Sequence, residues 1–211
     1  MMKMVLLGPP GAGKGSQAEA LMKKLGVPAI STGDILRDAV KRETPVGLEA
    51  KAFMDAGELV PDGVIIGIVI ERVSRQDCGE GFILDGVPRT LAQAEALDEQ
   101  GIKIDVVLSI EITDEEILER LGGRRACPDC NSIYHIASKP PAEDGVCDNC
   151  GSALITRKDD ERETILTRLL TYHKDTEPLK EYYRSQGKLK TVDNIPGIAE
   201  TTAAIYEKLG I

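Results

Sequence analysis

The sequence predicts an α/β fold, a parallel five-stranded sheet with helices on both faces. Short apolar runs alternate with segments of helical period along most of the 211 residues. This alternation is typical of sheets that are assembled from strand–helix–strand units. The first apolar run, Lys3–Leu7, is followed at once by a glycine-rich turn and a helical segment. Strand, glycine turn and helix in that order are characteristic of the first unit of such a sheet.

The other strands are predicted from short apolar runs bounded by turn residues. They are expected at Pro28–Ile30, Gly81–Leu84, Asp105–Ile110 and Leu189–Val192. The helices between and after the strands are expected at Gly13–Leu25, Thr90–Gln100, Asp114–Leu121 and Gly197–Leu209. The pattern is helical again from Glu161 to Ser185, with a kink or break expected at Pro178 because proline has no amide hydrogen to donate.

Two stretches interrupt the alternation and predict insertions into the core. Residues 31–60 have helical patterns that are broken at Thr44-Pro45 and Gly57, so two short helices are expected. Residues 123–160 have no helical period and contain four cysteines with several prolines and glycines. We therefore expect a core made of residues 1–30, 61–122 and 161–211, a small helical insertion at 31–60 and a second insertion at 123–160.

The overall charge argues against several classes of partner. The chain has 26 basic and 35 acidic residues and a formal net charge of −9, so it has no bulk attraction for nucleic acid or anionic membranes. Only 3% of the residues are aromatic, which leaves few stacking platforms for single strands. Apolar runs of about 18 residues, long enough to span a bilayer, are absent from the sequence. We expect a cytoplasmic monomer that binds neither nucleic acid nor membrane.

The turn after the first strand is a candidate phosphate-binding loop. The segment Gly8–Lys14 has the spacing G-x-x-x-x-G-K. Glycines let backbone amides close around phosphate oxygens, and the following helix adds the positive end of its dipole. Lys14 is placed to reach the β- and γ-phosphates of a nucleoside triphosphate. Gly15 stands where a Ser or Thr usually follows the lysine, and Ser16 comes next, so a magnesium role for the hydroxyl is left open.

Asp85 is the candidate magnesium residue. It directly follows the apolar run Gly81–Leu84. The carboxyl end of such a strand lies near the phosphate loop in an open α/β sheet. An aspartate there can hold Mg²⁺ or the water molecules around it, although a strand that ends in Asp-Gly can also be only a turn.

Six arginines in predicted loops and at helix ends are candidates for binding further phosphates. Guanidinium groups donate two parallel hydrogen bonds to phosphate and keep their charge. The six are Arg37, Arg89, Arg120, Arg124, Arg157 and Arg168. Any one of them could be a surface residue, but the group indicates an acceptor that itself carries phosphate. Such an acceptor is already an anionic nucleophile and needs no strong base, so His135 and His173 are interpreted as structural.

Four cysteines predict a closed metal site in the second insertion. Cys127 and Cys130 form one C-x2-C pair, Cys147 and Cys150 form another, and sixteen residues separate the pairs. This is the spacing of a four-cysteine zinc ribbon, which has no open coordination position and is therefore structural. Disulfides are the alternative, but they are uncommon in the cytosol. The fifth cysteine, Cys78, is interpreted as a small buried apolar residue.

Taken together, these motifs resemble the adenylate kinase family in its bacterial form with a long, metal-bearing lid. The resemblance covers nearly the whole chain. It is carried by Gly8–Ser16, Ser31–Arg37, Leu84–Arg89, Gly123–Arg125, the two cysteine pairs and Arg157–Glu161. It implies a core of the P-loop nucleoside triphosphate hydrolase-like fold. The implied reaction is the reversible, magnesium-dependent transfer of a phosphoryl group from ATP to AMP, which gives two ADP and serves nucleotide balance and purine salvage.

The resemblance also assigns residues to sites. It implies ATP binding by Gly11, Ala12, Gly13, Lys14, Gly15, Ser16, Arg124, Ile133, Tyr134 and Pro196. It implies AMP binding by Thr32, Arg37, Glu58, Leu59, Val60, Gly86, Val87, Pro88, Arg89, Gln93, Arg157 and Arg168. The catalytic group would be Lys14, Asp85, Arg89, Arg124, Arg157 and Arg168. Structural Zn²⁺ would be held by Cys127, Cys130, Cys147 and Cys150, and Mg²⁺ would accompany ATP. The Gln93 amide offers a donor and an acceptor, which suits the edge of adenine.

Three alternative functions differ from this one in testable ways. A kinase for another nucleoside monophosphate would differ in its acceptor preference. A GTPase-type switch is disfavoured because the sequence has no Asn-Lys-x-Asp signature after the fourth strand. A nucleic-acid-binding module built on the zinc ribbon is disfavoured by the negative charge and the few aromatic residues.

Overall fold

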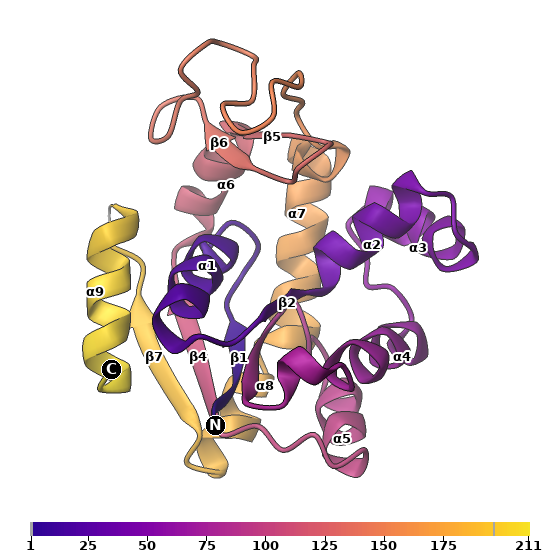
Figure 1. Cartoon of the computed structure of the whole chain (residues 1–211), viewed down its shortest axis with the longest axis vertical. Helices are drawn as coiled ribbons and strands as arrows, with labels where there is room; N and C mark the ends of the chain where they lie inside the picture. Colours follow the sequence, from indigo (N-terminus) through magenta and orange to yellow (C-terminus); the bar gives the residue numbers. More distant parts are fainter. Residues whose placement is uncertain (1, 196) are drawn as a thin grey trace.

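The chain folds around a five-stranded parallel sheet with the strand order β2-β3-β1-β4-β7 (Figure 1). The computed structural model describes residues 2–195 and 197–211. The strands are β1 (Met2–Leu7), β2 (Ala29–Ser31), β3 (Gly81–Asp85), β4 (Val106–Glu111) and β7 (Leu189–Asp193), and all four neighbouring pairs are parallel. The predicted parallel sheet is therefore confirmed, with strand ends that differ from the expected ones by at most one residue.

Helices cover both faces of the sheet because its strands are apolar on both sides. Val5, Leu84 and Val107 belong to a core on one face, where α4, α5 and α8 pack. Met4, Ile83 and Leu108, their direct neighbours in the strands, belong to a core on the other face with α1 and α9. Successive side chains of a strand point to opposite faces. This arrangement leaves the carboxyl ends of the strands free at one edge, where the site forms.

The helix bounds follow the predicted pattern with one addition. The helices are α1 (Lys14–Leu25), α2 (Thr32–Lys41), α3 (Pro45–Ala56), α4 (Asp62–Val73), α5 (Leu91–Glu99), α6 (Asp114–Gly122), α7 (Arg162–Thr171), α8 (Leu179–Ser185) and α9 (Ile198–Leu209). Short 3₁₀ turns occupy Gln76–Cys78 and Lys158–Asp160. Helix α4 was not predicted from the sequence. The break near Pro178 takes the form of a π-helical segment, Tyr172–Thr176, between α7 and α8.

Several helices begin where a side chain accepts a hydrogen bond from the first turn. The Ser31 hydroxyl accepts from the Asp34 amide before α2, and the Thr90 hydroxyl accepts from the Gln93 amide before α5. Before α6, Thr113 and Glu116 satisfy each other's backbone amides in a capping box. Such caps fix where each helix starts, and therefore where the preceding strand delivers its last residue.

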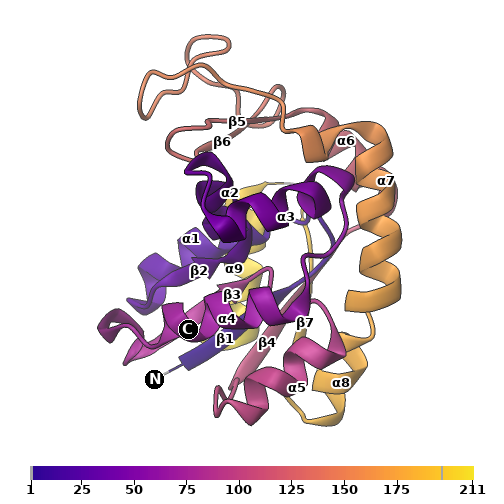
Figure 2. The ribbon, with the colours of Figure 1, turned by 90° about the vertical axis from the view of Figure 1, so that its right-hand side faces the viewer.

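The two predicted insertions project from the same edge of the sheet (Figures 1 and 2). Residues 31–60 contain α2 and α3. Residues 123–160 contain a small antiparallel pair, β5 (Arg124–Ala126) and β6 (Ile133–His135), and otherwise irregular backbone. The Lys41 ammonium lies 2.6 Å from a carboxylate oxygen of Asp129, so the two insertions contact each other.

Within the described residues, the helices are all too short or too polar to cross a bilayer.

Candidate active site

The phosphate loop, Gly8–Lys14, connects β1 to α1 at the carboxyl edge of the sheet. Gly8 has a φ of +139° and Gly11 has a φ of +82°, which side chains rarely allow. A Cβ atom on Gly8 would lie 2.5 Å from the carbonyl oxygen of Ile110, and one on Gly11 would lie 3.0 Å from Leu121. Glycine therefore lets this loop pack closely against the end of β4 and against α6.

The side chain of Lys14, the last residue of the loop, folds back into the loop. Its Nζ donates hydrogen bonds of 2.8 Å to the carbonyl oxygens of Gly8 and Pro9. Burial lowers the pKa of Lys14 to about 8, and the neighbouring Asp85 carboxylate opposes part of that effect. The ammonium is therefore still charged at neutral pH, and it is positioned to interact with an anion in the loop.

Asp85 ends β3 directly opposite the start of α1. Burial raises the pKa of its carboxyl group, while Lys14 and then Arg89 act in the opposite direction. Asp85 and Ser16 line the same cavity. A carboxylate and a hydroxyl are hard oxygen donors of the kind that Mg²⁺ prefers, so the two residues fit a magnesium ion that arrives with a nucleotide.

Arginines from different segments surround the loop. Arg124 and Arg168 share the side chain of Asp160, which has no exposed surface: Arg124 donates over 2.7 and 2.5 Å, and Arg168 lies 3.4 Å away. Burial lowers the pKa of Arg168 and of Arg157 to about 10. Arg89 is held by a 2.9 Å bond from its Nε to the carbonyl oxygen of Gly86. Arg89, Arg124 and Arg168 are thus directed by protein partners rather than left free in solvent.

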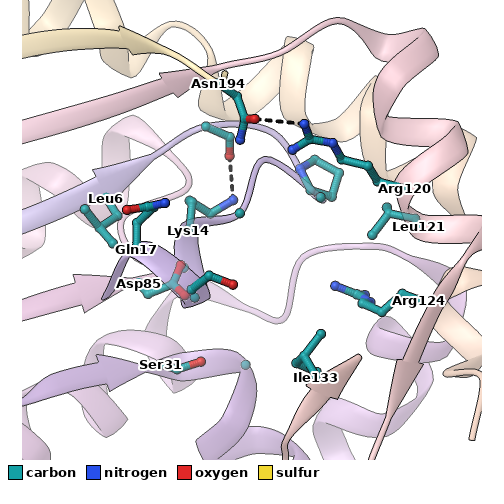
Figure 3. A pocket seen from close by; sticks show the side chains of 18 of the residues that line it. Leu6, Lys14, Gln17, Ser31, Asp85, Arg120, Leu121, Arg124, Ile133 and Asn194 are labelled. Atoms are coloured by element: carbon teal, nitrogen blue, oxygen red, sulfur yellow. Dashed lines mark hydrogen bonds between the residues drawn. The ribbon is translucent and has the colours of Figure 1, made fainter. Parts of the chain in front are cut away.

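The loop and the arginines line a cavity of about 670 Å³, which we call the main cleft (Figure 3). In Figure 3, Lys14 and Asp85 lie close together, while Arg120 and Arg124 extend toward them from the opposite wall. A second, smaller cavity, the side pocket, is lined from α2, α3 and the segment that follows β3. Arg37, Arg89 and Arg168 line both cavities. Two phosphate-bearing molecules bound in them would therefore meet at the same three cations.

Nearly all the residues expected at the nucleotide sites line one of these cavities. The main cleft is lined by Gly11, Gly13, Lys14, Gly15, Ser16, Asp85, Pro88, Arg124, Ile133, Tyr134 and Arg157, among others. The side pocket adds Thr32, Glu58, Val60 and Gln93, and Leu59 and Gly86 line both. The side chains of Ala12 and Val87 instead lie in the two hydrophobic cores. Pro196 lies outside the described residues.

Two residues of the site, Asn194 and Asp160, were not predicted from the sequence. Asn194 directly follows β7; its amide donates to the Ala12 carbonyl oxygen and accepts from Arg120, each over 2.8 Å. Asn194 therefore links the phosphate loop to α6. Its position at the carboxyl end of a strand, where Asp85 also lies, is the one signal that could have indicated it. Asp160 lies in the Arg157–Glu161 motif, but its role as a shared partner of two arginines becomes evident only in three dimensions.

The two histidines do not form a catalytic pair. His135 lines the main cleft, and its Nδ1 accepts from the backbone amides of Ala137 and Ser138. His173 lies between Asp114 and Glu177. These contacts agree with the structural interpretation made from the sequence.

The four predicted metal ligands come together above the cleft. The Sγ atoms of Cys127, Cys130, Cys147 and Cys150 all lie within 4.8 Å of one another. The closest sulfur pairs are 3.4 and 3.5 Å apart, far longer than a disulfide bond of about 2.0 Å. A tetrahedral zinc ion with bonds of about 2.3 Å needs sulfur atoms about 3.8 Å apart. The cluster therefore fits a zinc ion and does not fit disulfides.

Comparison with known proteins connects this geometry to a family. The adenylate kinase family model matches residues 6–188. The chain is 53% identical to an adenylate kinase of Caldicellulosiruptor bescii over the full length of both chains. It is 51% identical to adenylate kinases of Carboxydothermus hydrogenoformans and of Archaeoglobus fulgidus, with 99% of each chain covered. A match over most of the sequence and identity at about half of the positions show that this chain belongs to the adenylate kinase family.

Proposed function

We propose that the chain transfers the γ-phosphoryl group of ATP to AMP and runs the reaction in both directions, as the family to which it belongs does. The observation that carries this assignment is the pair of adjoining cavities with Arg37, Arg89 and Arg168 in their shared wall. Phosphoryl transfer requires two phosphate chains in line and neutralisation of charge between them. A shared wall of cations meets both requirements.

In this proposal the main cleft binds ATP. The backbone amides of the phosphate loop and the Lys14 ammonium would bind its phosphates, and Ile133 and Tyr134 of the second insertion would cover the nucleotide. Mg²⁺, held through Asp85 and Ser16 or through their water molecules, would supply further charge neutralisation on the phosphates. Arg124 and Arg157 would contact the transferred group when the second insertion, residues 123–160, lies over the cleft as a lid.

The side pocket would bind AMP within the insertion of residues 31–60. Thr32, Glu58, Leu59 and Val60 would surround the nucleoside, Gln93 would contact the base edge, and Arg37 and Arg89 would bind the phosphate. The AMP phosphate attacks as an anion, so no general base is needed. The lid would exclude water, which would otherwise accept the phosphoryl group.

The zinc ion would stabilise the lid and take no part in the chemistry. Its four ligands leave no open position, and the phosphate loop, Arg89, Arg120 and Arg168 all belong to residues 1–30, 61–122 and 161–211, outside the lid. We further propose that the protein acts as a monomer in the cytoplasm, without nucleic acid or membrane partners, because its negative charge gives it no attraction to either.

The test follows ADP formation from ATP and AMP with magnesium, using Lys14→Met as the matched inactive control. Rates with CMP, UMP and GMP as acceptors are measured in parallel. AMP should be the best acceptor by a wide margin. A better rate with another monophosphate would keep the kinase assignment and change the acceptor, whereas no transfer to any of the four would reject it.

A further inference from the structure

The Gln93 amide is held by two partners before any substrate binds. Gln93 is 1% exposed and lines the side pocket. Its Oε1 accepts a 2.7 Å hydrogen bond from the Arg89 backbone amide. Its Nε2 donates a 2.7 Å hydrogen bond to the Oδ1 of Asp62. The amide therefore keeps one lone pair and one hydrogen for a ligand.

Asp62 is itself anchored. It is the first residue of α4, and its Oδ2 accepts a 3.1 Å hydrogen bond from the Thr90 hydroxyl. The same hydroxyl accepts from the Gln93 backbone amide and caps α5. The carboxylate thus joins the start of α4 to the start of α5. Asp62 is not one of the described residues that line the side pocket, so it is placed behind Gln93.

The two partners of the amide have fixed and opposite polarity. A carboxylate only accepts hydrogen bonds, and a backbone N–H only donates them. Turning the amide over would set its oxygen against the Asp62 carboxylate and its NH₂ against the Arg89 amide, leaving buried groups unpaired. A favourable contact between Asp62 and the dipole of α4 would explain an acid at this position but not its bond to Gln93.

We infer that Asp62 is a positioning residue that fixes which way Gln93 reads a purine edge, and so favours 6-amino over 6-oxo purine monophosphates. This inference rests on the proposed function. The edge of adenine presents an N6 donor beside an N1 acceptor, and the edge of hypoxanthine presents an O6 acceptor beside an N1 donor. One orientation of a primary amide matches the first edge, and the reversed orientation matches the second.

The test substitution is Asp62→Asn, which keeps the shape of the side chain but can also donate a hydrogen bond. An asparagine would tolerate the reversed Gln93 amide at one of its two contacts, while the Arg89 amide would still oppose it. We expect the ratio of kcat/KM for AMP to kcat/KM for inosine monophosphate to fall about tenfold, the factor that corresponds to one hydrogen bond. The kcat at saturating AMP should change little.

Two controls separate positioning from general stability. Asp77→Asn removes an exposed carboxylate that pairs with Arg72 of α4, so it weakens the same helix without touching Gln93, and it should leave the ratio unchanged. In a Gln93→Leu background, Asp62→Asn should change the ratio no further, because its effect passes through Gln93. The ratio is measured on one sample, so it does not depend on the folded fraction. If the Asn variant does not fold, Asp62→Ser replaces it.

The outcomes are distinct. An unchanged ratio in the Asp62→Asn variant overturns the inference, as does an equal loss with both acceptors. A further fall in the double variant would show that Asp62 acts independently of Gln93 and would also overturn it. If the unmodified chain transfers no phosphoryl group to AMP, the proposed function itself fails before the ratio is measured.

Discussion

The phosphate loop and the cysteine ribbon (residues 123–160) both gather charge in tight turns, but they are supported in different ways. The phosphate loop is flanked by strands whose residues, such as Leu6 and Ile110, lie in a core that extends across the sheet. The buried cluster within the ribbon consists of Cys127, Tyr134 and Cys147, with Cys130 and Leu154 packed against it. The phosphate loop is thus held by a large hydrophobic core, whereas the ribbon has only a small cluster and four thiols that could bind a ligand.

Two turns of the same local geometry support the ribbon in place of a large core. Asn131 and Gly151, each directly after the second cysteine of a pair, have φ values of +60° and +76°. Their amides donate to the carbonyl oxygens of Cys127 and Cys147 over 3.1 and 2.8 Å. Each turn therefore presents two thiols from local backbone alone. The two halves of the ribbon are also linked by the paired backbones of Ala126 and Ile155 and by the bond from the Asp148 amide to the Tyr134 hydroxyl. We expect a metal bound by the four thiols to join the turns themselves, and such binding can supply on the order of 10 kcal/mol.

The largest expected effect is on catalysis and comes from a substitution in the phosphate loop that leaves the fold intact. Lys14→Met should lower kcat by roughly 100- to 1000-fold or more, because it removes the ammonium charge that would stabilise the transferred phosphoryl group. The melting temperature should change little, since the hydrophobic framework remains. Steady-state kinetics measure the change in kcat, and calorimetry measures the melting temperature. A kcat within tenfold of the parent would show that the loop is not the catalytic site.

The reverse outcome is expected for the ribbon. Cys130→Ser leaves three thiolates, so metal content and melting temperature should fall together. Each kcal/mol that is lost lowers the melting temperature by about 2–4 °C in a chain of this size. Below that temperature much of kcat should remain, with some loss as Arg124 and Arg157 shift. If metal removal abolishes activity while the fold stays intact, the ion is catalytic and the division of roles fails.

Alkaline pH should affect the loop and spare the ribbon. Burial lowers the pKa of Lys14 to about 8, so the charged form dominates below pH 8 and is lost above it. Because kcat/KM reports on the free enzyme, its value for ATP should fall about tenfold per unit above pH 8. Metal content should hold over that range, since thiolates bind more strongly as pH rises. A flat kcat/KM profile up to pH 10 would contradict this account of Lys14.

The smallest expected effect concerns motion of both insertions. Lys41 of α2 pairs with Asp129 of the ribbon, and Lys158 pairs with Asp55 of α3 over 2.9 Å. These exposed pairs are weak, so bound nucleotides should be what holds the insertions together. A mimic carrying two adenosines should slow hydrogen exchange in residues 31–60 and 123–160. Equal exchange with and without the mimic would refute closure.

The sequence predicted the sheet, the phosphate loop and the cysteine cluster because each has a local pattern. It did not predict α4, whose apolar residues, such as Ile65, Ile66 and Val69, leave no clear polar face. The π-helical segment was not predicted either, because Pro178 marks a break without specifying its form. Asp160 and Asp62 act through partners far away in the chain or on another helix, and a single aspartate gives no sign of such partners.

The cations between the two cavities also bear on direction. Arg37, Arg89 and Arg168 line both the main cleft and the side pocket, so in the proposed function the same three charges would face the phosphoryl group whichever molecule carries it. A complex of ATP with AMP and a complex of two ADP would then have comparable free energies on the protein. An internal equilibrium close to unity lets neither complex become a trap. The net direction is set, as for any catalyst, by the relative concentrations of the three nucleotides. What comparable bound states would add is speed in both directions, so the chain would respond to an excess of ADP as readily as to an excess of ATP and AMP.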